Sequence, residues 1–177
     1  MTSTYAHVER ERRFLLAAPP DPDAVTATRR ITDRYLDGTR LRLRRMACVD
    51  DGTVVHKFTQ KVPAERPGPV QGLITNTYLT AAEHQVLAAL PAAVLSKTRL
   101  SVPPLGIDVF DPPLHGLVLA EAEFTSDEAA EAFRPPAGVV AEVTADARFT
   151  GGRLVRTERA ELLGWLAGYG IAVPDGR

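Results

Sequence analysis

The sequence predicts an α+β protein that is mainly β, with antiparallel strands forming either a sandwich or a closed barrel. Three observations predict this class. Charged and apolar residues alternate in many short runs, as they do in strands whose two faces meet different surroundings. Asp-Gly pairs at residues 37–38 and 51–52 separate consecutive runs at hairpin spacing. Helix start signals are few, and about eight strands in one domain favour these two architectures.

The composition is that of an ordinary folded protein. The 177 residues are 45% hydrophobic and 24% charged, which suits one domain over 1–177. Because 21 basic residues nearly balance 22 acidic ones, a general nucleic-acid surface is not expected. The apolar runs are shorter than the roughly 18 residues of a membrane span. Cys48 is the only cysteine and cannot form an internal disulfide, so a cytoplasmic location is the default. Its side chain is expected to be small and buried or half-buried.

The strands follow from the period of two. The segment 34–46 contains the Asp37-Gly38 turn and then the second strand of the chain. The other strands are expected at 7–16, 53–62, 72–80, 95–102, 106–110, 116–124 and 139–146.

The helices follow from capping patterns. Thr80 and Glu83 form a Thr-x-x-Glu capping box before the segment 81–90. Ser126 precedes 127–133, where acidic residues in the first turn suit the helix dipole. A C-terminal helix is expected over 157–170, where glycines end an apolar face. The segment 21–30 is a weaker candidate for a short helix or turn.

Along several predicted strands, charged residues gather on one face, and those two residues apart mostly carry the same sign. The first strand places Glu9, Glu11 and Arg13 on one face. Later strands place together Arg42 with Arg44, Lys57 with Lys61, Lys97 with Arg99, and Glu121 with Glu123, while Asp108 lies opposite apolar neighbours. A solvated surface would mix the two signs, because cross-strand pairs of opposite charge are stabilising. We therefore expect these faces to need an external counter-charge.

The two sets of charges call for two kinds of ligand. Paired carboxylates suit a hard divalent cation such as magnesium or manganese, which prefers oxygen ligands. Clustered arginine and lysine side chains suit phosphate oxygens. Together they describe a site for a metal-bound polyphosphate. The four histidines do not fall at metal-ligand spacing, and the chain has no P-loop and no G-x-G-x-x-G.

The segment HVERERRFLL resembles the E-x-E-x-K signature of the CYTH superfamily, the triphosphate tunnel metalloenzymes. The segments RYLD with LRLRR, FTQK, LSKTRL, GIDVF, LVLAEAEF and EVTADARF follow in the order of that family's strands. The resemblance covers a core of about 5–157. It implies a closed eight-stranded antiparallel β-barrel that forms a charged tunnel, with helices flanking the outside.

The resemblance also implies roles for individual residues, with Mg²⁺ or Mn²⁺ as cofactor. Asp108 would hold a metal or orient bases, and Glu142 and Asp146 would be partners of tunnel bases. Arg13, Tyr35 and Lys97 are the catalytic candidates. The metal candidates are Glu9, Glu11, Asp108, Glu121 and Glu123, and the substrate-binding candidates are Arg13, Arg42, Arg44, Lys57, Lys61, Lys97 and Arg99.

Two departures from the family pattern affect the expected chemistry. Arg13 replaces the signature lysine and cannot act as a general base, because a guanidinium stays protonated. Thr75 and Thr77 take the places that match a further glutamate pair. The favoured function is metal-dependent hydrolysis of inorganic tripolyphosphate. Hydrolysis of thiamine or nucleoside triphosphates, adenylate cyclase activity, and polyphosphate binding without turnover stay open. We expect a triphosphate as partner, neither nucleic acid nor membrane, and a monomer or homodimer.

Overall fold

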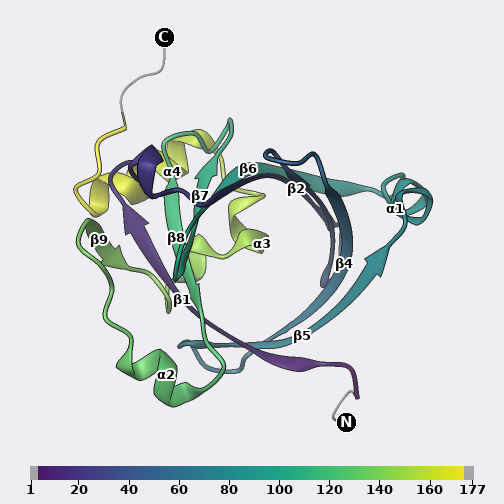
Figure 1. The fold of residues 1–177 in the computed structure, drawn as a ribbon, viewed down its shortest axis with the longest axis horizontal. Coiled ribbons are helices and arrows are strands. Elements are labelled where there is room, and N and C mark those ends of the chain that lie inside the picture. Colours follow the sequence, from purple (N-terminus) through teal and green to yellow (C-terminus); the bar gives the residue numbers. More distant parts are fainter. Residues whose placement is uncertain (1–3, 174–177) are drawn as a thin grey trace.

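The computed structural model describes residues 4–173, and its strands form a ring seen end-on in Figure 1. Within these residues, nine strands make one sheet. The strands are β1 (His7–Leu16), β2 (Ala27–Leu36), β3 (Leu41–Cys48), β4 (Val54–Pro63), β5 (Val70–Leu79), β6 (Ala92–Val102), β7 (Leu105–Phe110), β8 (Val118–Glu123) and β9 (Val139–Glu142). The helices are η1 (Pro22–Ala24), α1 (Ala81–Leu87), α2 (Asp127–Ala132), η2 (Ala147–Phe149), α3 (Gly151–Leu154) and α4 (Arg159–Gly168).

Eight of these strands close into an antiparallel barrel. The sheet runs in the order β5-β4-β3-β2-β6-β7-β8-β1-β9, and an additional pairing of β5 with β1 closes the ring. In that closing ladder His7 lies opposite Ile74, and Glu9 lies opposite Gly72. The second half of β1 pairs with β9 instead, which leaves β9 outside the ring. The closed eight-stranded barrel is therefore confirmed, and the sandwich is excluded.

Two strand predictions were wrong in detail. For 21–30 the sequence predicted only a short helix or turn, and η1 does occupy residues 22–24, but strand β2 begins at Ala27. Asp21 and Pro22 confine the turn to residues 22–24, and the residues from Ala27 onward form a strand. The predicted strand 139–146 ends at Glu142 and is β9. Thus β2, not the segment near 140, completes the barrel.

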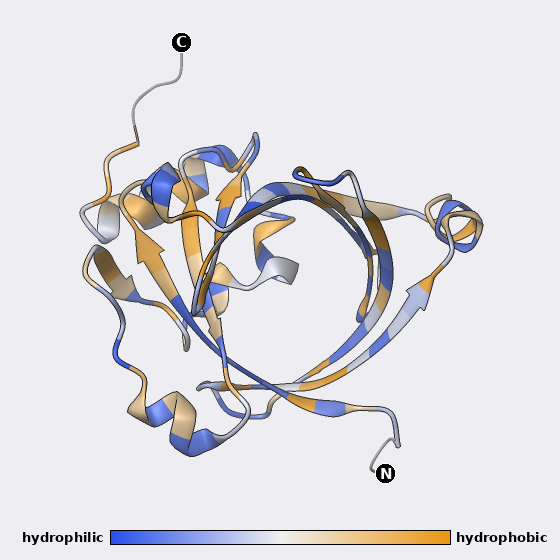
Figure 2. Ribbon diagram, in the orientation of Figure 1, coloured by the Kyte–Doolittle hydropathy of each residue, from blue (hydrophilic) through white to orange (hydrophobic). Residues whose placement is uncertain are grey.

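The ladder registers decide which side chains point into the barrel. Residues directly opposite in an antiparallel pair share one face of the sheet. Arg13 lies opposite Glu121, Arg44 opposite Lys57, and Arg99 opposite Asp108. The like-charged faces predicted from the sequence are thus parts of one inner face. Figure 2 shows the resulting alternation of hydrophilic and hydrophobic colour along the strands.

The inner face becomes apolar toward one end of the barrel. There Leu15, Leu95, Phe110 and Leu119 form one buried cluster with the C-terminal segment. That segment contributes Phe149, Leu154, Leu162 and Leu166 from η2, α3 and α4. The hydrophobic colour where β1, β7 and β8 meet α4 in Figure 2 marks this contact. Burial of these side chains holds η2 and α3, neither of which the sequence predicted, across this end of the barrel.

The predicted helix caps are present. Thr80 and Glu83 form the reciprocal capping box of α1, and the Ser126 hydroxyl accepts a hydrogen bond from the Ala129 N–H at the start of α2. Helix α4 is shorter than the predicted 157–170, because Glu158 and Glu161 form a capping box that starts it at Arg159. No helix within residues 4–173 has the length and apolarity that crossing a membrane requires.

Candidate active site inside the barrel

The barrel encloses a cavity of about 660 Å³. Residues from most strands line it, and α3 contributes Gly151 and Gly152. All of the predicted catalytic, substrate-binding and metal candidates except Asp108 line this cavity, namely Glu9, Glu11, Arg13, Tyr35, Arg42, Arg44, Lys57, Lys61, Lys97, Arg99, Glu121 and Glu123. The sequence therefore identified a set of residues that the fold brings together.

Four carboxylates from β1 and β8 form what we call the acidic wall: Glu9, Glu11, Glu121 and Glu123. Glu11 lies directly opposite Glu123 in the β1–β8 ladder, an arrangement that is destabilising for like charges. Burial of Glu11, together with the nearby charge of Glu121, raises the pKa of its carboxyl to about 7. The positive charges of Lys61 and Arg13 are therefore outweighed at Glu11 by burial and by the neighbouring carboxylates.

Four bases from β3 and β4 form what we call the basic wall: Arg42, Arg44, Lys57 and Lys61. On the neighbouring strand β5, Asn76 lies opposite Thr59, and Ile74 lies opposite Lys61. These two residues line the cavity. Thr75 and Thr77, which the resemblance placed in the tunnel, alternate with them and lie on the outer face, so that assignment was one residue out of register. Two uncharged residues nonetheless stand next to the basic wall.

A buried carboxylate that the sequence did not identify, Asp33, anchors the basic wall. It is completely buried and accepts hydrogen bonds of 2.7 Å from both Nε and a terminal nitrogen of Arg44. Burial opposes its ionisation, but Arg44 and Arg42 outweigh burial and hold the pKa of Asp33 well below its usual range. Recognising 27–36 as a strand would have placed Asp33 beside Tyr35 on the inner face.

The bases of β6 are neutralised within the barrel. Lys97 donates to Asp108 at 2.5 Å, and Arg99 donates to Asp108 at 2.7 and 2.6 Å. Arg99 also pairs with Glu121. Burial alone would raise the pKa of Glu121, but Arg99 and Lys97 keep it well below its usual range. The expectation that like-charged faces need an external counter-charge was therefore wrong for β6, whose partners come from β7 and β8.

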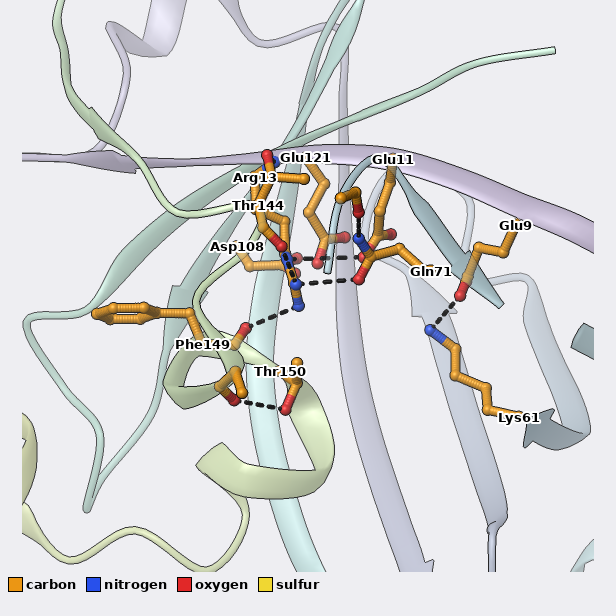
Figure 3. A network of polar contacts seen from close by, with 12 residues as sticks. Glu9, Glu11, Arg13, Lys61, Gln71, Asp108, Glu121, Thr144, Phe149 and Thr150 are labelled. Carbon is orange, nitrogen blue, oxygen red and sulfur yellow. Dashed lines mark hydrogen bonds and ion pairs between the residues drawn. The ribbon is translucent and has the colours of Figure 1, made fainter. Parts of the chain in front are cut away.

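Arg13 is buried and makes contacts within the protein (Figure 3). Its guanidinium donates to the carbonyl oxygens of Thr144 at 2.8 Å and Phe149 at 3.2 Å, and to Oε1 of Gln71 at 3.0 Å. Its Nε lies 3.9 Å from Glu11. Arg13 thus ties β1 to β5 and to the C-terminal segment. Spacing along the sequence gave no signal for these carbonyl partners.

Tyr35 lies against the start of α3. A side chain at Gly151 would overlap the Tyr35 hydroxyl, so glycine is required for this close approach. Burial, reinforced by the nearby Asp33, raises the pKa of Tyr35 to about 12. The phenol therefore stays neutral at working pH and can act as a hydrogen-bond donor.

The donor chemistry of the acidic wall fits a hard divalent cation. Four carboxylates supply oxygen ligands, and the facing pair Glu11 and Glu123 would be relieved by added positive charge. Their geometry is not preassembled, since no three acidic, histidine or cysteine side chains within residues 4–173 are gathered closely enough to hold a metal. Two of the four carboxylates are already engaged in ion pairs: Glu9 with Lys61 at 2.7 Å, and Glu121 with Arg99. Asp108 is fully buried under Lys97 and Arg99, a position suited to orienting these bases.

Some residues near the predicted site lie elsewhere. Glu142 pairs on the outside of the barrel with Arg12 at 2.6 Å, and Asp146 caps η2 and pairs with Arg148. The suggested partnership of these two acids with tunnel bases was therefore wrong. Cys48 is half-buried, as expected.

Two solved structures of a protein called NE1496 resemble the chain. The structure described as the inorganic triphosphatase NE1496 is 27% identical, covers 84% of this chain and 95% of its own, and superposes with a TM-score of 0.54. A second, described as the hypothetical protein NE1496, is 29% identical over 85% of this chain and 99% of its own, with a TM-score of 0.55.

A further structure shares the fold alone. The PH1819 protein from Pyrococcus horikoshii OT3 is 15% identical, covers 70% of this chain and 83% of its own, and has a TM-score of 0.52. No family model and no curated protein sequence matches the chain. The closed barrel, the order of its charged strands and the likeness to an inorganic triphosphatase are together consistent with the CYTH superfamily, the family that the sequence resembles.

Proposed function

We propose that the chain is a metal-dependent triphosphatase that hydrolyses inorganic tripolyphosphate inside the barrel. The observation that carries this proposal is the placement of an acidic wall and a basic wall around one cavity. A metal-bound triphosphate brings positive charge to the first wall and negative charge to the second. The likeness to a structure described as an inorganic triphosphatase supports the choice of substrate class.

In this proposal the basic wall binds and orients the phosphoryl chain. Asp33 fixes Arg44, so its guanidinium is preorganised and loses little freedom when substrate binds. Lys97 and Arg99, oriented by Asp108, would contact the same chain. The Tyr35 phenol would donate a hydrogen bond. Electrostatic positioning of this kind supplies most of the catalysis in phosphoryl transfer.

The acidic wall would hold Mg²⁺ or Mn²⁺ through Glu11 and Glu123, joined by Glu9 and Glu121 once substrate draws Lys61 and Arg99 away from them. When bound, such an ion neutralises phosphoryl oxygens and polarises water. A cytoplasmic location, expected from the single unpaired cysteine, belongs to the same proposal.

The test is release of phosphate from tripolyphosphate across a panel of divalent metals, with wild type beside Glu11→Gln. Metal-dependent release that is lost in the variant supports the proposal. Release of cyclic AMP and pyrophosphate from ATP would instead indicate a cyclase. Equal activity with and without metal chelation would contradict metal dependence.

Arg13 favours a second candidate function, polyphosphate binding without turnover. Its side chain is committed to Gln71, Thr144 and Phe149, and it cannot exchange a proton. Calorimetry that finds tight tripolyphosphate binding, while phosphate release stays absent across metals and alkaline pH, would select this candidate.

A further inference from the structure

Lys57 differs from the other lysines of the cavity. Lys61 is paired with Glu9, and Lys97 is paired with Asp108. In the part of the chain from 4 to 173, the half-buried Lys57 makes no hydrogen bond and no ion pair, although it lines the cavity. It is a charged group in a confined site that the fold leaves without a partner.

The groups around Lys57 are mostly basic. From β3, Arg44 lies directly opposite it and Arg42 lies nearby; on β5, Tyr78 occupies the opposite position in register. Two acids favour its charged form from a distance, without pairing with it: Asp33 on β2, already shared by Arg44 and Arg42, and Glu123 on β8. Burial, with repulsion from Arg44 and Arg42, lowers the pKa of Lys57 to about 8.

We infer that Lys57 is the proton-linked contact of the basic wall: it binds the triphosphate as an ammonium, and the bound phosphates supply the negative charge that the cavity lacks at this position. The inference rests on the proposed function and deepens it, because it names the residue that couples substrate binding to pH. In mildly alkaline solution the neutral amine takes one proton from solvent when substrate binds. No bond of the substrate changes in this step.

Arg13 cannot change its charge with pH, so a titratable base of the cavity has to lie elsewhere. The family signature has a lysine at that position, whereas the arginine present here keeps its proton and is held by carbonyl oxygens. Lys57 lies on a different wall of the same cavity and can change its charge near physiological pH. Affinity for a triphosphate should therefore decline as pH rises above about 8, and an arginine at 57 should remove that decline.

The test is calorimetric titration with Mg²⁺ and imidotriphosphate, which resists hydrolysis, in three buffers of different ionisation enthalpy. The dependence of the heat on the buffer gives the protons taken up per ligand bound. Protonation of the ligand itself contributes equally in every variant and cancels in the comparison. The variants are Lys57→Arg, which keeps a permanent charge, and Lys57→Met, with Gln60→Met as the matched control on the outer face of β4.

At pH 8.5 wild type and Gln60→Met should take up about 0.7 proton more than Lys57→Arg, because roughly three quarters of Lys57 is neutral before binding. At pH 6.5 the difference should vanish. Lys57→Met should lose the same uptake and bind roughly tenfold more weakly, which preserves the test if Lys57→Arg does not fold. Equal uptake by all variants at pH 8.5, with binding intact, would overturn the role of Lys57 alone. Absence of binding by wild type would overturn the proposed function together with this inference.

Discussion

The acidic wall on β1 and β8 and the basic wall on β3 and β4 face one cavity, yet each has a group that the protein leaves poorly compensated. On the acidic wall, burial and Glu121 raise the pKa of Glu11 to about 7. On the basic wall, burial, Arg44 and Arg42 lower the pKa of Lys57 to about 8. Each shift disfavours the charged form of its group. The acidic wall therefore needs positive charge and the basic wall needs negative charge, and one ligand that carries both signs can supply them.

The remaining bases of the cavity provide a contrast. Asp108 holds Lys97 and Arg99, and Asp33 holds Arg44, through direct hydrogen bonds. These acids lie at 0% exposure, so their task is to fix bases rather than to meet solvent. These acids preorganise their bases for substrate, whereas Glu11 and Lys57 would gain a compensating charge only from a ligand.

Removing the acidic wall should have the largest effect. The double variant Glu11→Gln with Glu123→Gln removes the facing carboxylates, so phosphate release from tripolyphosphate should fall at least about a hundredfold. Binding of imidotriphosphate without metal should persist, because the basic wall is intact. Glu131→Gln on the exposed side of α2 is the control. Full activity of the double variant would refute the distinction between the walls.

Loss of the anchor beneath the basic wall should mainly affect stability. Asp33→Asn leaves the buried Arg44 without its carboxylate, which should lower the free energy of unfolding by about 3 kcal/mol. Urea denaturation measures this loss. At a temperature where the variant is folded, its KM should rise more than its kcat falls, because Arg44 is no longer held in place. An unchanged KM would show that Arg44 does not need Asp33 for binding.

A methyl group at Gly151 should disturb the side of the cavity where the start of α3 lies against Tyr35, outside both walls. Gly151→Ala would push against the Tyr35 hydroxyl, at a cost of roughly 2 kcal/mol in stability. Adding Tyr35→Phe removes the oxygen that would collide, so the double variant should regain much of the loss. Thermal unfolding of the three proteins measures this; no rescue by Tyr35→Phe would mean that the overlap is relieved elsewhere.

Restoring the family lysine at position 13 should weaken the contacts that hold this buried base in place. Arg13→Lys cannot reproduce the hydrogen bonds to Gln71, Thr144 and Phe149, so stability should fall by about 1 to 2 kcal/mol. Phosphate release should not increase. A faster enzyme of unchanged stability would show instead that position 13 serves catalysis directly.

The smallest effect concerns stability as a function of pH. Because the folded-state pKa of Glu11 is raised from 4.5 to about 7, its contribution is full below pH 4.5 and is lost as pH rises through 7. The single variant Glu11→Gln carries no such titration. Relative to wild type, its free energy of unfolding should therefore rise by about 1 kcal/mol between pH 6 and pH 7 without metal. A difference that stays constant with pH would contradict the charge deficit at Glu11.

Much of the site could be predicted, because strand alternation alone decides which side chains share a face. Glu9, Glu11 and Arg13 are two residues apart, so a strand places them on one face. The family resemblance predicted that the strands close into a barrel. What the sequence could not show depends on distant contacts. The partners of Arg13 are carbonyl oxygens of a C-terminal segment held by apolar packing, and Asp33 was missed along with the strand that carries it. The one-residue error at Thr75 and Thr77 shows that alternation needs the ladder register to fix the face.

The most direct test of the two-wall account is a crystal structure with Mn²⁺ and imidotriphosphate, using the anomalous signal of manganese to locate the ion. We expect manganese bound to the carboxylates of Glu11 and Glu123, with phosphoryl oxygens against Arg42, Arg44 and Lys57. Manganese and phosphate bound outside the barrel, or phosphate inside it with no ion on the acidic wall, would contradict the account.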